Sequence, residues 1–339
     1  MKVNELRTIL KERKKDELAY LIVEMYKQIP KKVREGKELD ELIQDPDAFK
    51  KARKGTKQYV KNLDFASVER EVRSFIKNAR EQNYIAPNRI IPKKERSNWR
   101  FTAKRLIEQV MEISNQDKHA KVSTSLMEDL YKLFCYASGH YVFASDEPFY
   151  TIKIPQPEFL KRVVMMKKRV DEPKKWIPES LSLMLDYDLD PVEVTASLSE
   201  AFFETLDNAP LKEEVVKQAD HLLQKKESTR RNVDDFHKTP KDYDKEFYID
   251  HVVELIFIIQ SSLGEYKEAI RYYHKHYSRH DTSEIRLYVL LQMVMRYQRV
   301  EDWIREYEKA VKKRIKPRDS LKKAYEYMKQ TNEFPSYIG

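Results

Sequence analysis

The amino-acid sequence predicts an all-α protein, a multi-helix array with a helical hairpin repeat at its C-terminal end. Only five glycines occur among its 339 residues. Sheets, hairpins and phosphate-binding loops need glycine where the backbone dihedral φ is positive or where backbones approach closely. The chain is also 41% hydrophobic, which is ample for a core, and its apolar residues recur at helical spacing. These observations argue against an α/β nucleotide-binding fold and favour helices.

Capping residues and prolines indicate where individual helices begin. Asp, Ser and Asn side chains accept hydrogen bonds from the free N–H groups of a first helical turn, and proline fits the first helical position. Behind Asp64, for example, apolar residues from Val68 to Ala79 recur at helical spacing. Helix starts are expected, in order, near Val3, Asp16, Asp45, Asp64, Ser97 or Asn98, Ser123, Glu158, Pro178, Asp190 and Pro210.

The length of the chain corresponds to two or three domains at roughly 150 residues per domain. Residues 83–98 contain two prolines and lack helical periodicity, and the residues that follow 226 are polar and rich in turn formers. We therefore expect an N-terminal helical region over 1–86 and a central helical region over 87–226, which a basic loop enters. A polar linker over 227–246 and a repeat region over 247–339 complete the chain.

An internal repeat is visible in the last part of the chain. The stretch Leu263–Tyr273 reads LGEYKEAIRYY, and a shift of 34 residues places Ala269 on Trp303 and Tyr273 on Tyr307. These residues resemble the turn and second helix of a tetratricopeptide repeat, and the resemblance covers residues 247–330. A generic helical bundle is the alternative interpretation, because any array of helical hairpins gives some of this periodicity.

The resemblance departs from the family pattern in the second repeat. Gln298 stands where the turn glycine is expected, and Trp303 stands where a small residue normally lets the helices approach. A helix after Pro317 would cap the array. The resemblance implies stacked helical pairs with a concave face that binds an extended or helical peptide. The candidate partner-binding residues are Tyr266, Arg271, Tyr272, His274 and Arg305.

The N-terminal 30 residues form a second, fainter pattern. Val3–Leu6 and Lys15–Leu18 are similar to the helix–loop–helix opening of SAP-like modules and of uncharacterised bacterial helical proteins. A SAP-like module would imply DNA binding, but the glycine that normally separates its helices is missing. Two consecutive amphipathic helices explain the same residues.

The net charge of +9 comes from one part of the chain. Residues 51–100 hold 14 Lys and Arg against 5 Asp and Glu, and the remaining residues balance. Cations interleaved with aromatic residues are typical of nucleic-acid surfaces, because cations contact phosphates and aromatic rings stack on bases. The alternative is that the aromatic residues anchor a helix in the core. The candidate residues are Arg89, Lys93, Lys94, Arg96, Trp99, Arg100, Lys104 and Arg105.

No catalytic motif stands out, so the sequence leaves enzymatic activity open and favours a non-enzymatic role. Cys135 is the only cysteine, which excludes an intramolecular disulfide framework. His276 and His280 have a spacing that suits two metal ligands, but Lys275 and Arg279 would repel a cation. We predict no metal and no cofactor.

The lack of an apolar leader or of a long apolar segment predicts a cytoplasmic protein without a membrane partner. The expected function is that of a scaffold or adaptor, which binds a protein or peptide in the helical-repeat groove. A nucleic-acid-associated protein that contacts phosphates through Arg89–Arg105 is the alternative. The sequence makes no prediction of the oligomeric state.

Overall fold

The computed structural model describes residues 9–30, 34, 39–47, 64–228, 240–277 and 282–338. The chain divides into two compact units, Met1–Leu63 and Asp64–Gly339. The predicted all-α, multi-helix class is confirmed, because the described residues hold many helices and no strand. An isolated antiparallel bridge between Phe143 and Ser145 is the β-type pairing in this part of the chain.

The first unit contains two described helices, α2 (Lys15–Gln28) and α4 (Leu39–Gln44). None of the residues of α2 is buried. The helix predicted behind Asp16 is therefore present, with Asp16 inside its first turn rather than at the cap position. The helix predicted from Val3 and the one predicted from Asp45 lie largely outside the described residues.

The second unit begins with a capped helix. The Asp64 carboxylate accepts a hydrogen bond from the Ser67 N–H at 3.1 Å, and Val68, Val72 and Phe75 of the predicted stripe are buried. The first helices of this unit are α6 (Phe65–Arg80), α7 (Lys93–Arg96), α8 (Trp99–Ser114), α9 (Asp117–Gly139) and α10 (Pro148–Ile152).

Four further helices follow, and three predicted starts need correction. The helix expected near Asp190 begins at Thr195, with Val194 as its cap residue. Ser123 does not cap a helix, because α9 has begun at Asp117 and Ser123 is buried within it. Pro178 likewise lies inside its helix, where Pro173 takes the first position. The predicted starts near Glu158 and Pro210 agree with the structure. The helices are α11 (Gln156–Val170), α12 (Pro173–Leu185), α13 (Thr195–Phe203) and α14 (Ala209–Glu227).

The C-terminal part consists of five helices. They are α15 (Pro240–Ser262), α16 (Tyr266–His276), α17 (Ser283–Tyr297), α18 (Val300–Lys312) and α19 (Asp319–Thr331). Because α15 begins at Pro240, the helix includes residues 240–246 of the range predicted as a polar linker.

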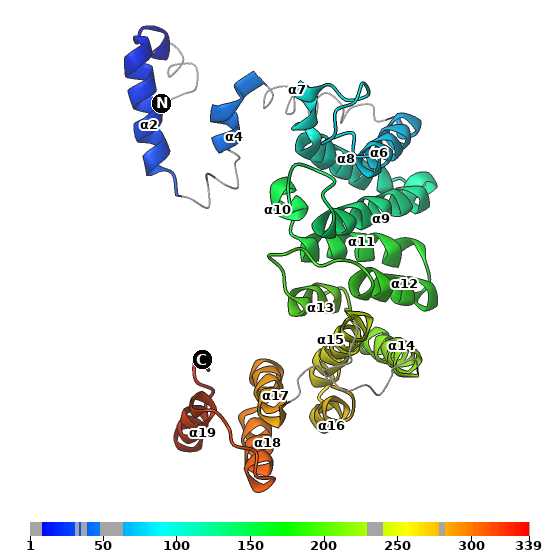
Figure 1. Ribbon diagram of the computed structural model, residues 1–339, viewed down its shortest axis with the longest axis vertical. Helices are drawn as coiled ribbons and strands as arrows, with labels where there is room; N and C mark the ends of the chain where they lie inside the picture. The colour runs from blue at the N-terminus through cyan, green and yellow to red at the C-terminus, as the bar shows by residue number, and fades with distance from the viewer. Residues whose placement is uncertain are drawn as a thin grey trace. The chain divides into compact units, whose positions relative to one another are not determined.

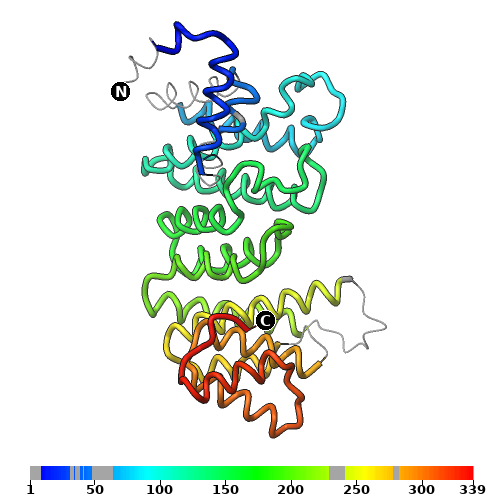
Figure 2. The backbone as a smooth tube through the Cα atoms, turned by 90° about the vertical axis from the view of Figure 1, so that its left-hand side faces the viewer, coloured from blue at the N-terminus to red at the C-terminus, as the bar shows by residue number. Residues whose placement is uncertain are grey.

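Helices of the second unit pack against their neighbours in a continuous series (Figures 1 and 2). Pairs that follow one another along the chain form hairpins, as in α11–α12, α15–α16 and α17–α18. Alternate helices also touch, so α11 contacts α13, α13 contacts α15, and α15 contacts α17. The hydrophobic core is therefore continuous across the boundary that was predicted between the central and repeat regions.

Helix α15 lies at the centre of this packing. It contacts α12, α13, α14, α16 and α17, and residues from Val252 to Ile259 are buried with the exception of Glu254. A helix segment that buries residues on every side is stable only when other helices surround it. Despite this apolar stretch, no described helix is both long and apolar enough to cross a bilayer.

Candidate protein-binding groove

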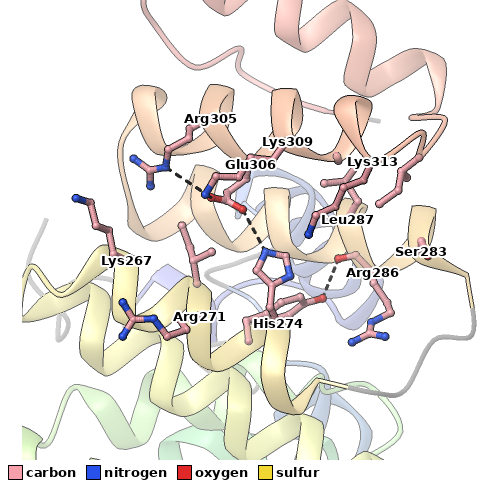
Figure 3. Close-up of a pocket in the computed structure, with 14 residues that line it drawn as sticks. Lys267, Arg271, His274, Ser283, Arg286, Leu287, Arg305, Glu306, Lys309 and Lys313 are labelled. Carbon is pink, nitrogen blue, oxygen red and sulfur yellow. Dashed lines mark hydrogen bonds and ion pairs between the residues drawn. The ribbon is translucent and has the colours of Figure 1, made fainter.

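A groove of about 680 Å³ opens between α16, α17 and α18. In Figure 3, side chains from α16 and α18 face one another across it, with α17 behind. Its lining holds six Lys and Arg residues and one acid, a balance of +5 with histidine neutral. These residues are Lys267, Arg271, Arg286, Arg305, Lys309 and Lys313 against Glu306.

Helical periodicity places the cations on one side of each helix. Lys267 and Arg271 are four residues apart on α16, and Arg305 and Lys309 are four residues apart on α18. Residues with this spacing share a helix face. Ile270 and Tyr273 of the apolar stripe of α16 also line the groove, where Tyr273 is 1% exposed. The amphipathic pattern that folds the hairpins thus also directs cations into the groove.

Glu306 is a buried carboxylate at the base of the groove, with a side chain that is 3% exposed. It interacts with His274 Nε2 at 3.1 Å and accepts a hydrogen bond from Lys309 Nζ at 2.7 Å. Burial alone would raise the pKa of Glu306, but these two contacts outweigh burial and lower its pKa to about 2. The carboxylate is therefore ionised at neutral pH and already neutralised by groove side chains.

A second buried carboxylate holds Arg305 in place. Asp302 is fully buried, and its Oδ1 accepts a hydrogen bond from the Arg305 guanidinium at 2.5 Å. Its Oδ2 accepts a hydrogen bond from Arg299 Nε at 3.0 Å. The Arg305 side chain remains 34% exposed. The hydrogen bond from Arg305 to the buried Asp302 orients this guanidinium and leaves part of its surface exposed to the groove.

Arg286 is fixed from α17. Its guanidinium donates to the Tyr277 carbonyl at 2.6 Å, and its own carbonyl accepts from the Tyr273 hydroxyl at 2.9 Å. Burial raises the pKa of Tyr273, so this hydroxyl keeps its proton and remains a donor. A packed tyrosine thus positions the backbone that carries Arg286.

The positive charges of the remaining lining cations are neutralised weakly or not at all by nearby carboxylates. Arg271 lies 3.7 Å from Glu268, and both side chains are well exposed. Such a pair contributes little because solvent screens it. Within the described residues, no carboxylate lies within ion-pair distance of Lys267 or Lys313. These cations are available to an incoming anion.

The structure brings together three of the five residues predicted to bind a partner. Arg271, His274 and Arg305 line the groove. Tyr272 points elsewhere, because its hydroxyl donates to Asp220 of α14 at 2.8 Å. Tyr266 also lies outside the lining, where the Arg299 guanidinium covers its ring at 4.7 Å from the centroid.

Sequence reasoning missed Lys267, Arg286, Lys309, Lys313 and Glu306. Spacing by four residues from Arg271 and Arg305 was a signal for Lys267 and Lys309. Arg286 belongs to a different hairpin from Arg271, so only the packing of the helices shows that the two share a groove.

The basic stretch predicted as a nucleic-acid surface contains a core residue. Trp99 is 3% exposed, and its ring stacks on Phe143 with centroids 4.0 Å apart. Both rings lie in the packing between α8, α9 and the loop that follows α9. The Trp99 ring is therefore covered, as the alternative interpretation of this stretch expected, and offers no open face to a base.

The cations of the same stretch are partly used within the fold. Arg96 donates to the Ile91 carbonyl at 3.1 Å, and Arg105 donates to Glu71 Oε2 at 3.0 Å. The half-buried members are Arg96, Arg100, Lys104 and Arg105, and the exposed members are Arg89, Lys93 and Lys94.

The described residues hold no group of three or more His, Cys, Asp or Glu side chains that could bind a metal ion. His280 of the predicted histidine pair lies outside them. Burial raises the pKa of the Cys135 thiol to about 12, which makes this cysteine a poor nucleophile. No protein-family model matches the chain, and comparison with curated proteins and with solved structures likewise gives no match.

Proposed function

We propose that this chain is a non-enzymatic scaffold or adaptor whose C-terminal helices form a tetratricopeptide-like array. An acidic segment of a partner protein binds in the groove between α16, α17 and α18. One observation carries the proposal: six cations converge on a groove whose single acid is buried and neutralised by the fold. Complementary charge is the feature that such a surface selects in a partner.

The register of the C-terminal helices supports the repeat architecture. Helices α16 and α18 begin at Tyr266 and Val300, 34 residues apart. The positions paired by this shift have similar environments, since Ala269 and Trp303 are both fully buried. The Trp303 ring stacks on Tyr307 with centroids 5.4 Å apart. An aromatic stack therefore fills the space in the second hairpin, where the small residue of the family pattern is absent.

The two interhelical turns also correspond. Gly264 has a positive φ of 81°, which a glycine adopts without strain. Gln298, its counterpart, has φ −131° and needs no glycine. The Gln298 side chain donates to Ser261 Oγ at 2.9 Å and so links the second turn to the first hairpin. These contacts explain how a degenerate repeat still stacks.

The spacing of the cations suits an extended acidic segment. Residues four apart on a helix are separated by about 6 Å along its axis. Alternate residues of an extended chain are separated by about 6.8 Å and point to the same side. Carboxylates on every second residue of a bound segment would therefore meet successive cations on α16 or α18.

The test is binding of a labelled octapeptide with alternating Glu and Ser to the full chain, followed by fluorescence anisotropy. A peptide with Gln in place of Glu measures the contribution of charge. The decisive variant is Lys267→Glu/Lys313→Glu, because both lysines line the groove without an acidic partner. The matched control is Lys118→Glu/Lys121→Glu, which reverses two exposed lysines of α9.

We expect the groove variant to bind the Glu peptide 10- to 100-fold more weakly. The Coulomb energy of two unit charges ~6 Å apart in water is about 0.7 kcal/mol, and salt reduces this energy roughly by half. Reversing two lysines changes four units of charge. The α9 control and the Gln peptide should show no comparable effect. Equal losses in the two variants, or equal binding of the two peptides, would refute the proposal.

An oligonucleotide of equal charge tests the nucleic-acid alternative in the same assay. If that alternative holds, a single strand binds more tightly than the acidic peptide at physiological salt. Alanine substitution of Lys93 and Lys94 would then abolish binding, and the groove variant would leave it unchanged. The proposed function predicts that the acidic peptide binds more tightly than the oligonucleotide. It also predicts that the groove variant, and not the Lys93/Lys94 variant, weakens binding.

A further inference from the structure

The segment that follows α19 folds back onto α17 (Figure 1). Asn332 ends α19 in the left-handed conformation, with φ 56°, and redirects the chain. Ile338 is 3% exposed, so its side chain is buried. The Ile338 carbonyl accepts hydrogen bonds from Gln292 Nε2 at 3.1 Å and from the Tyr288 hydroxyl at 3.4 Å.

The other residues of this segment are more exposed than Ile338. Tyr337 is 80% exposed, and Glu333 and Ser336 are exposed. Phe334 and Pro335 are only half-buried. Residues 332–338 form no helix or strand. The hydrogen bonds of this segment to α17 both use one backbone carbonyl, and its one buried side chain is that of Ile338. Both features are available in any extended segment that carries an aliphatic residue.

The α17 face around Tyr288 and Gln292 is held in place by contacts that do not involve this segment. The Arg318 guanidinium lies over the Tyr288 ring at 3.9 Å from the centroid. Arg318 in turn donates to the two oxygens of Glu284 at 2.7 and 2.8 Å. Tyr288 and Gln292 are four residues apart and share a face of α17, whereas Arg286 and Leu287 line the cationic groove. The two surfaces are thus separate.

We propose that the α17 face around Tyr288 and Gln292 is a second peptide-binding surface. It takes an extended partner segment with an isoleucine-like side chain, and residues 332–338 occupy it until such a segment displaces them. Tethering gives these residues an effective concentration in the millimolar range, so even a weak contact competes with a partner. The backbone carbonyl fixes the register of the bound segment, and the buried side chain selects its chemistry.

The experiment uses a labelled, amidated peptide with the sequence of residues 331–338 and the full chain. In wild type the tethered segment competes, so we expect weak binding. The variant Ile338→Asp removes the apolar anchor and should bind the peptide at least tenfold more tightly. Adding Tyr288→Phe and Gln292→Ala to that variant should reverse the gain by fivefold or more. A peptide with Asp in place of its isoleucine should not bind.

Three results would overturn the proposal. The first is equal affinity of wild type and Ile338→Asp for the peptide, and the second is binding that is indifferent to Tyr288 and Gln292. The third is a wild-type dimer, seen by sedimentation, that Ile338→Asp abolishes, because the surface would then belong to a second copy of the chain. Circular dichroism checks the fold, and Ile338→Ser replaces the aspartate variant if helicity falls.

Discussion

Replacement of Glu306 by Gln should lower stability and strengthen the binding of acidic ligands at the same time. The carboxylate stabilises the fold through His274 and Lys309, but it is also the one negative charge in the groove lining. The neutral amide keeps the shape of the side chain. It removes the ion pairs and raises the charge balance of the lining from +5 to +6.

The magnitude follows from the pKa of Glu306, which falls from 4.5 to about 2 in the folded state. A carboxylate with a depressed folded pKa stabilises the protein above its unfolded pKa, and this stabilisation is lost as pH falls through the folded value. Linkage gives an upper estimate of about 3 kcal/mol at pH 7 and about 1.4 kcal/mol at pH 3. The groups that face this carboxylate are His274, Lys309 and Arg305.

The assay is urea unfolding of wild type and Glu306→Gln at pH 7 and again between pH 4.5 and 3. We expect the difference in unfolding free energy to shrink by about half over the acid range, because wild type loses its ionised carboxylate there. Peptide anisotropy at pH 7 should show binding that is two- to fivefold tighter in the variant. A variant as stable as wild type at pH 7, or a pH-independent difference, would refute the reasoning.

Two further substitutions test the packing. Trp99→Ala should lower the free energy of unfolding by about 3–5 kcal/mol, because the substitution leaves a cavity at a buried tryptophan site. A loss below ~1 kcal/mol in urea unfolding would contradict the place of Trp99 in the core. Gly264→Ala should cost about 1–2 kcal/mol through its positive φ alone, since nothing lies within 4 Å of the added methyl group. Unchanged thermal unfolding of this variant would argue against the turn conformation.

Much of the helical arrangement could be predicted from local sequence. The cap at Asp64, the stripe that follows it and the helix starts near Glu158 and Pro210 are local signals. Asp64 and Asn208 accept capping hydrogen bonds, and Pro157 and Pro210 lie in the first turns of their helices. The predicted helix start near Ser123 was wrong, because a hydroxyl group inside a helix can donate its hydrogen bond to a backbone carbonyl of the same helix. Thr124 shows this, since its hydroxyl donates to the Ala120 carbonyl at 2.8 Å.

The candidate groove was only partly predictable, because it depends on packing between hairpins. Arg271 and Arg305 stood out as cations on repeat helices. The role of Glu306 was hidden, since an acid in a chain with 56 Asp and Glu residues carries no local sign of burial. Trp99 illustrates the reverse case. Its cationic neighbours suggested stacking on bases, whereas the fold covers its ring with Phe143.

Under the proposed function, the charge distribution of the groove serves binding rather than stability. Cations that converge from three helices repel one another, and a chain selected for stability alone would gain by pairing each with a surface acid. Here the acids are placed beneath the cations instead. Asp302 and Glu306 are buried, and each contacts Arg305 from within the fold. Lys267 and Lys313 have no such partner among the described residues. Carboxylates supplied from outside would relieve this repulsion, so an acidic segment should stabilise the array as it binds.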